Sequence, residues 1–468
     1  MKYVSTRGQA PILDFDDALL SGLARDGGLY VPENWPSFSS GDISALNDLS
    51  YAETAFRVMR PFTGESISDD ELGWLIEDAY ASFDDPDVAP MKQLAEGEWL
   101  MELFHGPTLA FKDVAMQFLG RIFDHVLQKR GKRVTIVGAT SGDTGSAAIE
   151  AFRGRDAIEI FILHPEGRVS DVQRMQMTTV VDANVHNIAL KGTFDDCQNM
   201  VKAMFNDTSF RDRCNLSAVN SINWARVMAQ SVYYFYAAVR LGNPLRPVSF
   251  AVPTGNFGNV FAGYGAARMG LNIEQLIIGS NNNDILTRFF ETGSMEMTGV
   301  SPTISPSMDI QISSNFERLL FELYGRDGNI IKTMMDDFND TGSFSVGPEQ
   351  MEQAHKLFSA QRFSDDETRQ MIARVFAENN ELLDPHSAIG VAAGRARRSN
   401  PETPLVAMAT AHPAKFPDAV EQASGQYPTL PEKLSGLFDR SEHFTILEND
   451  MSQVQAFIEA HGTDGAVR

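Results

Sequence analysis

The sequence predicts an α/β protein in which an N-terminal α+β domain precedes two lobes built on parallel sheets. Three observations support this prediction. The chain has 468 residues, enough for two or three domains at about 150 residues each. Roughly the first 95 residues mix short apolar runs with helical patterns. Beyond them, apolar strands alternate with longer helical segments, which is typical of parallel sheets covered by helices.

The N-terminal part is predicted to form a domain over residues 1–95. Apolar residues recur at helical spacing in Phe15–Arg25. The glycines of Asp26–Gly28 follow and end that helix, because glycine accepts the left-handed conformation of a helix C-terminus. Leu29–Val31 is then a short strand. The acidic, proline-broken segment Asp84–Asp87 indicates the boundary loop.

The remainder, residues 96–468, is predicted to form parallel sheets with helices on both faces. The expected strands are Val134–Thr140, Ile158–His164, Asn184–Leu190, Val248–Val252, Leu276–Ser280 and Leu405–Thr410. The expected helices are Ser146–Arg153, Asp171–Val180, Asp195–Phe205, Trp224–Leu241, Val260–Met269 and Met451–His461. Ser170 is the expected N-cap of the second of these helices.

The charge of the chain excludes several kinds of partner. With 39 Lys+Arg and 62 Asp+Glu, the formal net charge is −23. Nucleic acids and anionic membrane surfaces attract basic proteins, so neither is an expected partner. An anionic small substrate would need a site that is locally rich in donors and cations.

The cysteines and histidines indicate the compartment and the absence of a metal. Cys197 and Cys214 cannot form a disulfide framework, which favours a reducing cytoplasm. The segment Met1–Leu20 has no apolar core of a signal peptide. The nine histidines show no metal-binding spacing, so we expect no metal site. The sequence leaves a monomer and a homodimer open.

A glycine-rich loop, Gly138–Ser146, links a predicted strand to a predicted helix. Backbone N–H groups at the helix start favour an anion, and the hydroxyls of Ser141 and Thr144 add donors. Ligands of open α/β sheets bind at the carboxyl ends of strands, which is where this loop lies. The alternative is an ordinary strand-to-helix turn.

A second loop, Pro253–Asn259, repeats this architecture after the strand Val248–Val252. Its glycines allow a phosphate to approach the backbone closely. Neither loop has the pattern GxGxxG or GxxxxGK[ST]. Dinucleotide-binding and Walker-type functions therefore lose their main support.

A third segment, His105–Asp113, contains a lysine in an unusual setting. Gly106–Thr108 is a turn signal, so Lys112 is expected near the start of the helix that follows. A cation is unfavourable there, and the neighbouring residues are largely apolar. Such surroundings favour the neutral amine and suit a lysine that forms a Schiff base. The alternative is a surface lysine paired with Asp113.

Long motifs connect these segments. They are HGPTLAFKD at 105–113, GATSGDTGSAA at 138–148, NSINWAR at 220–226, PTGNFGN at 253–259 and TAHPAKF at 410–416. Together they resemble the threonine synthase family, pyridoxal 5'-phosphate (PLP) enzymes of the tryptophan-synthase-β structural class. STRG at 5–8 and DGGLYVP at 26–32 look like the N-terminal domain of the longer, yeast- and enterobacterial-type branch. The resemblance covers nearly the whole chain. It implies that residues 96–468 form two α/β lobes of the PLP fold-type II kind, the smaller over roughly residues 130–235 and the larger over the rest.

The resemblance implies PLP as the cofactor and gives roles to particular residues. Lys112 would bind it as a Schiff base, and Thr410 would place a hydroxyl at the pyridine nitrogen. A neutral hydroxyl tunes the electron sink differently from a carboxylate. The residues that would hold the cofactor phosphate are Gly255, Asn256, Phe257, Gly258 and Asn259.

The substrate contacts are expected on several segments. The candidates are Thr108, Ser141, Gly142, Asp143, Thr144, Arg226, Arg288 and Lys415. Arginine can bind a phosphate through two hydrogen bonds at once. Asp284 follows a predicted strand and is expected to cap the helix Ile285–Glu291. For His105 and His412 we expect structural hydrogen bonds rather than proton transfer.

The implied reaction is a γ-elimination followed by a β-hydration. O-phospho-L-homoserine would lose its phosphate, and water would add at Cβ to give L-threonine, the last step of threonine biosynthesis. Lys112, freed when substrate binds, is the candidate base for the Cα and Cβ protons. PLP is expected in a cleft between the lobes, with the loop Ser141–Gly145 closing over the substrate.

Three other functions stay open at this point. One is a related PLP phospho-lyase that releases a keto acid from an O-phospho amino acid. Another is a nucleotide-binding protein of the Rossmann type, which the missing fingerprints oppose. The third is a non-enzymatic relative that binds PLP or phosphorylated amino acids.

Overall fold

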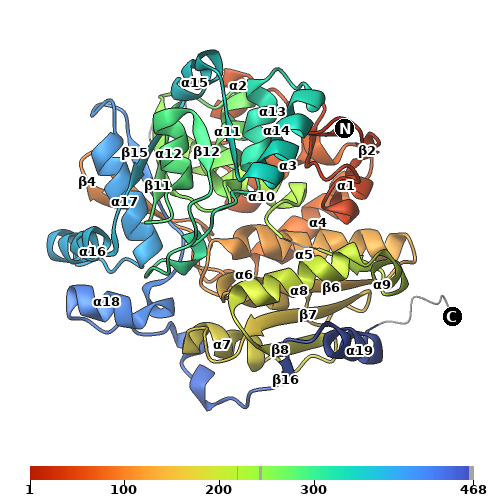
Figure 1. Ribbon diagram of the computed structural model, residues 1–468. Helices are drawn as coiled ribbons and strands as arrows, with labels where there is room; N and C mark the ends of the chain where they lie inside the picture. The colour runs from red at the N-terminus through yellow and green to blue at the C-terminus, as the bar shows by residue number, and fades with distance from the viewer. Residues whose placement is uncertain (219, 242–244, 463–468) are drawn as a thin grey trace. The chain divides into compact units, whose positions relative to one another are not determined.

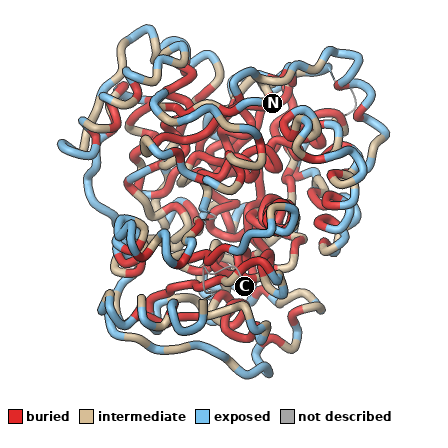
Figure 2. The backbone as a smooth tube through the Cα atoms, turned by 90° about the vertical axis from the view of Figure 1, so that its right-hand side faces the viewer, coloured by how far each residue is buried: buried red, intermediate tan, exposed pale blue. Residues whose placement is uncertain are grey.

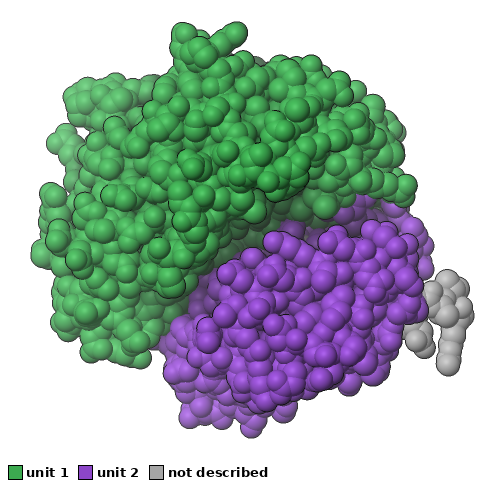
Figure 3. Space-filling model, viewed as in Figure 1, with its two compact units in different colours: residues 1–19, 23–115, 221–428 green, residues 20–22, 116–220, 429–468 purple. Residues whose placement is uncertain are grey.

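The computed structural model describes residues 1–218, 220–241 and 245–462. They pack into two compact units, which Figure 3 colours separately. Unit 1 is formed by residues 1–19, 23–115 and 221–428, and unit 2 by residues 20–22, 116–220 and 429–468, as far as these are described. Residues 463–468, the end of the predicted two-lobed region, lie outside the described part.

Unit 2 is built on a five-stranded sheet with the strand order β16-β8-β7-β6-β9, in which all neighbours are parallel. The strands are β6 (Val134–Ala139), β7 (Ile158–Pro165), β8 (Val185–Lys191), β9 (Leu216–Ser217) and β16 (Thr445–Glu448). The helices are α6 (Asp143–Phe152), α7 (Asp171–Thr178), α8 (Phe194–Asn206), α9 (Thr208–Arg213) and α19 (Met451–His461). The α/β alternation predicted for this part of the chain is therefore confirmed (Figure 1).

Unit 1 contains a six-stranded sheet with the order β14-β11-β10-β15-β5-β4, parallel except for the edge pair β4 and β5. Its strands are β4 (Met91–Ala95), β5 (Glu98–Glu102), β10 (Val248–Pro253), β11 (Ile273–Ser280), β14 (Phe358–Arg362) and β15 (Leu405–Ala409). The covering helices are α10 (Trp224–Arg240), α11 (Gly258–Arg268), α12 (Ile285–Thr292), α16 (Asp365–Asn379) and α17 (Pro385–Arg397).

Alternate residues of β10 point to opposite faces of this sheet, as the pleat requires. Ala251 belongs to the apolar cluster that includes Ile372 of α16 and Ala388 of α17. Phe250 points the other way and packs against Tyr234 of α10, with ring centroids 4.8 Å apart. Both faces are thus covered by helices. Figure 2 shows the resulting bands of buried residues.

The N-terminal part of unit 1 is a small antiparallel sheet, ordered β2-β1-β3, with short helices. The elements are β1 (Lys2–Ser5), β2 (Leu13–Asp14), α1 (Phe15–Ser21), β3 (Tyr30–Pro32), α2 (Ser40–Ser44), α3 (Tyr51–Thr63) and α4 (Asp69–Tyr80). The helix predicted over Phe15–Arg25 ends earlier, at Ser21, because Gly22 already has a positive φ of 61°.

Helix α5 (Lys112–Lys129) begins in unit 1 and continues into unit 2. The others are β12 (Ser294–Glu296), η1 (Pro306–Met308), α13 (Phe316–Leu323), α14 (Gly328–Thr341), β13 (Ser343–Ser345), α15 (Pro348–His355), η2 (Pro413–Lys415), α18 (Pro417–Ser424), η3 (Glu432–Leu434) and η4 (Leu437–Asp439). Among the described residues, no helix is both long and apolar enough to cross a bilayer.

Candidate active site

The turn before α5 is fixed by a buried aspartate. The carboxylate of Asp113 accepts hydrogen bonds from the backbone N–H and the hydroxyl of Thr108, at 2.8 and 2.7 Å. Gly106 leaves no space for a side chain, since a Cβ there would lie 2.4 Å from Cβ of Asp113. Leu109 adopts a left-handed φ of 63° although it is buried. This tight turn makes Lys112 the first residue of α5, which agrees with its predicted position near a helix start.

The same turn is joined to the end of β15. Phe111 donates its N–H to the carbonyl of Thr410 at 2.8 Å, and His412 donates its N–H to the carbonyl of Leu109 at 3.0 Å. Lys415 is fully buried, and its Nζ donates to the carbonyl of Thr108 at 2.6 Å. Two segments about 300 positions apart in sequence, carrying Lys112 and Thr410, are therefore brought together in unit 1.

Lys112 has a largely buried side chain, with 7% of the residue exposed. Its Nζ donates to the hydroxyl of Ser307 over 3.5 Å and lies 5.1 Å from the ring centroid of Phe111. Burial removes most of this side chain from bulk water. The environment therefore differs from that of a solvated surface lysine.

The loop between β10 and α11 is held by its carbonyls. The hydroxyl of Ser313 donates to the carbonyl of Gly255 at 2.7 Å. The amide of Asn315 donates to the carbonyl of Asn256 at 3.0 Å, and its backbone N–H does so at 3.1 Å. Phe257 takes a left-handed φ of 61°, and its fully buried ring compensates for that strain by packing. The loop carbonyls accept from these donors. The N–H groups at the N-terminus of α11 therefore need other hydrogen-bond acceptors.

The start of α11 has the properties of an anion site. No side chain caps this helix. Asn259 is buried, and its Oδ1 accepts from the hydroxyls of Tyr233 and Tyr234 at 2.6 and 3.0 Å. Its Nδ2 has no hydrogen-bond partner among the described residues. A buried N–H without a partner is costly, so a bound acceptor is expected. The phosphate of PLP fits this donor set.

A fully buried arginine, Arg318, contacts Asn315, the residue that holds the loop between β10 and α11. The guanidinium of Arg318 donates to the carbonyl of Tyr30 at 3.1 and 2.9 Å, to that of Ile222 at 2.6 Å, and to Oδ1 of Asn315. Burial lowers the pKa of Arg318 to about 9, so the group stays charged at neutral pH. Through Asn315, the N-terminal sheet is connected to the carbonyl of Asn256.

In unit 2, the loop after β6 is organised by Thr140. Its hydroxyl accepts from the N–H groups of Gly142 and Gly145 at 2.9 and 2.8 Å. Gly142 has a φ of 142°, and a Cβ there would lie 2.3 Å from the side chain of Gln173. The carboxylate of Asp143 accepts from Nε2 of Gln173 at 2.7 Å. The predicted residues Ser141 to Thr144 thus form one ordered turn at the carboxyl end of a parallel strand.

The two predicted substrate-binding arginines differ in burial and in hydrogen-bond partners. Arg226 is buried in the first turn of α10, and burial lowers its pKa to about 10. Arg288, on α12, donates to Oδ1 of Asp284 at 2.9 Å and to the carbonyl of Glu296 at 2.9 Å. Asp284 occupies the N-cap position of α12, as predicted, but its carboxylate pairs with Arg288 one turn later instead of accepting from the helix N-terminus.

Models of three protein families match the chain. "Threonine synthase N terminus" matches residues 2–80, "Pyridoxal-phosphate dependent enzyme" residues 89–337, and "Threonine synthase, C-terminal" residues 387–458. A curated threonine synthase from Pseudomonas aeruginosa is 56% identical over 466 residues, which cover 99% of each chain.

The chain belongs to the threonine synthase family.

Solved structures agree with this assignment. The PLP-bound threonine synthase from Brucella melitensis has a TM-score of 0.97 and 56% identity, covering 99% of both chains. The yeast threonine synthase has a TM-score of 0.94 and 40% identity, covering 98% of both chains. The predicted family, fold class and cofactor are confirmed. The enzyme is a PLP-dependent lyase of threonine biosynthesis that acts on O-phospho-L-homoserine.

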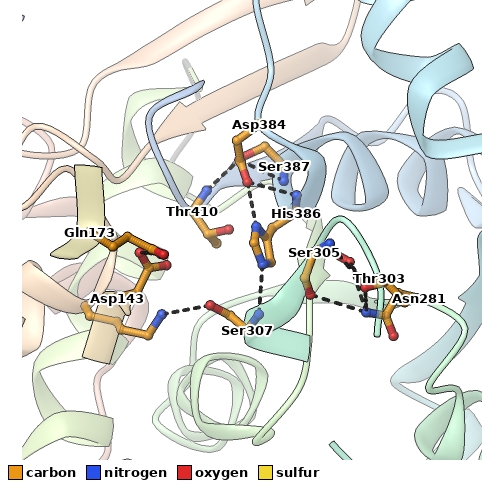
Figure 4. Close-up of polar contacts among 11 residues, drawn as sticks. Asp143, Gln173, Asn281, Thr303, Ser305, Ser307, Asp384, His386, Ser387 and Thr410 are labelled. Atoms are coloured by element: carbon orange, nitrogen blue, oxygen red, sulfur yellow. Dashed lines mark hydrogen bonds and ion pairs between the residues drawn. The ribbon is translucent and has the colours of Figure 1, made fainter. Parts of the chain in front are cut away.

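Several residues beside Lys112 and Thr410 in this threonine synthase fold were not predicted from the sequence. Figure 4 shows Ser307, Asp384, His386 and Ser387 joined by hydrogen bonds. Asp384 precedes Pro385, which is the signature of a helix N-terminus and could have indicated the capping role. No spacing in the sequence indicates that Ser307 meets His386, 79 positions later.

Proposed function

We propose that Lys112 is the catalytic lysine of this threonine synthase, and that Gly255–Asn259 and Thr410 hold its cofactor. The observation that carries the proposal is the hydrogen-bonded junction of the Lys112 turn with the Thr410 strand end, at 2.8 Å. The unpartnered Nδ2 of Asn259 and the uncapped start of α11 support the cofactor-binding role of the loop.

When bound, PLP supplies an electron sink for charge that develops on the substrate. The amine of Lys112 would take and return the protons at Cα and Cβ of the substrate, because a general base must lie within hydrogen-bond reach of the proton. The hydroxyl of Thr410 would meet the pyridine nitrogen. The N–H groups at the start of α11 and Nδ2 of Asn259 would hold the cofactor phosphate.

The residues proposed to contact the substrate share donor groups or positive charge. In unit 1 they are Thr108, Arg226, Arg288 and Lys415, and in unit 2 they are Ser141, Gly142, Asp143 and Thr144. The departing phosphate needs such donors, since its charge increases as the bond breaks. Arg226, whose pKa is about 10, would be charged at neutral pH.

The test is an incubation of the purified protein with O-phospho-L-homoserine, with inorganic phosphate and L-threonine measured in the same sample. We expect equal amounts of both. Phosphate with a keto acid in place of threonine would identify the related phospho-lyase instead. Lys112→Ala should abolish turnover while leaving the fold intact. Full activity in that variant would refute the assignment of Lys112.

We also propose a domain organisation, a compartment and an assembly state. The N-terminal domain would cover residues 1–95 and the two lobes residues 96–468, with the smaller lobe over roughly residues 130–235. The net charge of −23 supports a protein without nucleic-acid or membrane partners. A monomer or homodimer in the cytoplasm is proposed, and light scattering of the purified enzyme distinguishes the two states.

A further inference from the structure

A buried carboxylate at the start of α17 has more donors than a helix cap needs. Asp384 is fully buried and is the N-cap residue of α17. It accepts from the backbone N–H groups of His386 and Ser387 at 2.9 and 3.0 Å, which is ordinary capping. It also accepts from Nδ1 of His386 at 2.7 Å and from the hydroxyl of Ser387. These two side-chain donors fix the orientation of both side chains.

The first of these side chains leads to Lys112. Nδ1 of His386 donates to Asp384, so Nε2 is the acceptor of the neutral ring. The backbone N–H of Ser307 donates to this Nε2 at 3.2 Å. The hydroxyl of Ser307 in turn accepts from Nζ of Lys112 at 3.5 Å. Figure 4 shows Asp384, His386 and Ser307 in line.

The second side chain leads to Thr410. The hydroxyl of Ser387 donates to Asp384 and accepts from the backbone N–H of Thr410 at 3.0 Å. The carbonyl of Thr410 accepts from the N–H of Phe111 at 2.8 Å, next to Lys112. These hydrogen bonds, together with the chain segment from Phe111 to Lys112, therefore form a closed ring. The ring begins and ends at Asp384 and passes through Lys112 and Thr410.

We propose that Asp384 and His386 are positioning residues that hold the Lys112 amine and the Thr410 strand end at a fixed separation. The inference rests on the roles proposed above for Lys112 and Thr410. Reacting groups that are displaced by about 1 Å can lose about a hundredfold in rate, so a closed ring of buried and partly buried hydrogen bonds would affect turnover directly. The ring also contains a single charged carboxylate, which the start of α17 stabilises.

Two substitutions of His386 separate positioning from simple packing. In His386→Gln, the amide oxygen can accept from the N–H of Ser307 in place of Nε2. In His386→Asn, the shorter amide can still donate to Asp384 but cannot reach Ser307. The matched control is His355→Asn, because His355 of α15 is also hydrogen-bonded, to the carbonyl of Phe290 at 2.8 Å.

The measurements are kcat and KM for O-phospho-L-homoserine and the induced circular dichroism of the PLP band in the purified holoenzymes. We expect His386→Asn to lower kcat about 10- to 100-fold, with KM changed less than about threefold. Its PLP dichroism should decrease, because the fixed orientation of the cofactor is lost. His386→Gln should restore both properties to within about fivefold, and His355→Asn should change neither.

Equal losses in the Gln and Asn variants, or an unchanged dichroism in His386→Asn, would overturn the inference. If His386→Asn does not fold, Ser387→Ala tests the other half of the ring and should likewise lower kcat with little change in KM. A Lys112→Ala enzyme that stays active would refute the proposed function. Loss of activity in Lys112→Ala with a fully active His386→Asn would refute only the positioning role.

Discussion

Replacing the buried guanidinium of Arg318 by a thioether should weaken unit 1 and its cofactor site together. Arg318→Met keeps an unbranched apolar side chain that fills much of the space. It removes the donors to the carbonyls of Tyr30 and Ile222 and to Oδ1 of Asn315. Three buried acceptors without donors cost about 1–3 kcal/mol each, or about 3–9 kcal/mol together.

Part of this cost is offset, because the variant no longer buries a charged group. Desolvation of a buried ion amounts to several kcal/mol. We therefore expect a net loss of about 2–4 kcal/mol in the free energy of unfolding of unit 1. Asn315 loses the partner that orients its amide toward Asn256. The dissociation constant of PLP should accordingly rise about tenfold.

Tryptophan fluorescence in urea follows this change specifically. All four tryptophans, Trp35, Trp74, Trp99 and Trp224, belong to unit 1. The matched control is Arg326→Met, because Arg326 donates to the carbonyls of Pro32 and Glu33 from a partly exposed position and should lose less than about 1 kcal/mol. An Arg318→Met enzyme with unchanged unfolding and unchanged PLP affinity would refute the supporting role of this residue.

Further predictions concern single residues. Thr410→Ala should keep PLP bound but lower kcat, and an unchanged kcat would remove its hydroxyl from the reaction. Gly106→Ala should destabilise the Lys112 turn by about 1–3 kcal/mol, because its Cβ would lie 2.4 Å from Cβ of Asp113; thermal unfolding measures this loss. Asn259→Ala should weaken PLP binding in an equilibrium titration, and unchanged binding would contradict its phosphate contact. Burial lowers the pKa of His164 below its ordinary value. The unfolded chain therefore takes up a proton that the folded chain does not, and unit 2 loses stability as the pH falls below about 6.5. Amide hydrogen exchange of unit 2 at about pH 5 should be slower in His164→Phe than in the parent enzyme; equal exchange rates would exclude this histidine as a cause.

Much of unit 2 could be predicted from the sequence because its signals are local. The strand β7 extends over Ile158–Pro165, within a residue of the predicted Ile158–His164. Ser170 caps α7, as predicted. A strand can be predicted from a run of apolar residues that ends in a turn signal without knowledge of distant contacts. By contrast, α11 begins at Gly258 rather than Val260, because its first turn is built from residues that are typical of loops.

The contacts around Lys112 could not be predicted from local sequence patterns. The motif around Lys112 indicated a special lysine, but Ser307 and His386 carry no local pattern that connects them. Arg318 likewise gives no sign in the sequence of its contact with Tyr30. Such pairs depend on tertiary proximity, which no local pattern in the sequence reveals. Asp284 is the N-cap residue of α12, as predicted, but its carboxylate makes no capping bond, since a favourable pair one helical turn away competes with capping.

The contact between Tyr30 and Arg318 also affects when the N-terminal sheet can complete its packing during synthesis of the chain. The two residues are 288 positions apart. At a synthesis rate of roughly 5–20 residues per second, the N-terminal sheet leaves the ribosome roughly 15–60 seconds before the arginine that completes it. Until residue 224 has been made, Tyr3 and Trp35 also lack Trp224, their aromatic neighbour in unit 1. The packing of the N-terminal segment is thus incomplete when this segment leaves the ribosome. Its assembly has to wait for the later part of the nascent chain, and a ribosome that stalls before residue 318 exposes an unfinished aromatic core to chaperones and proteases.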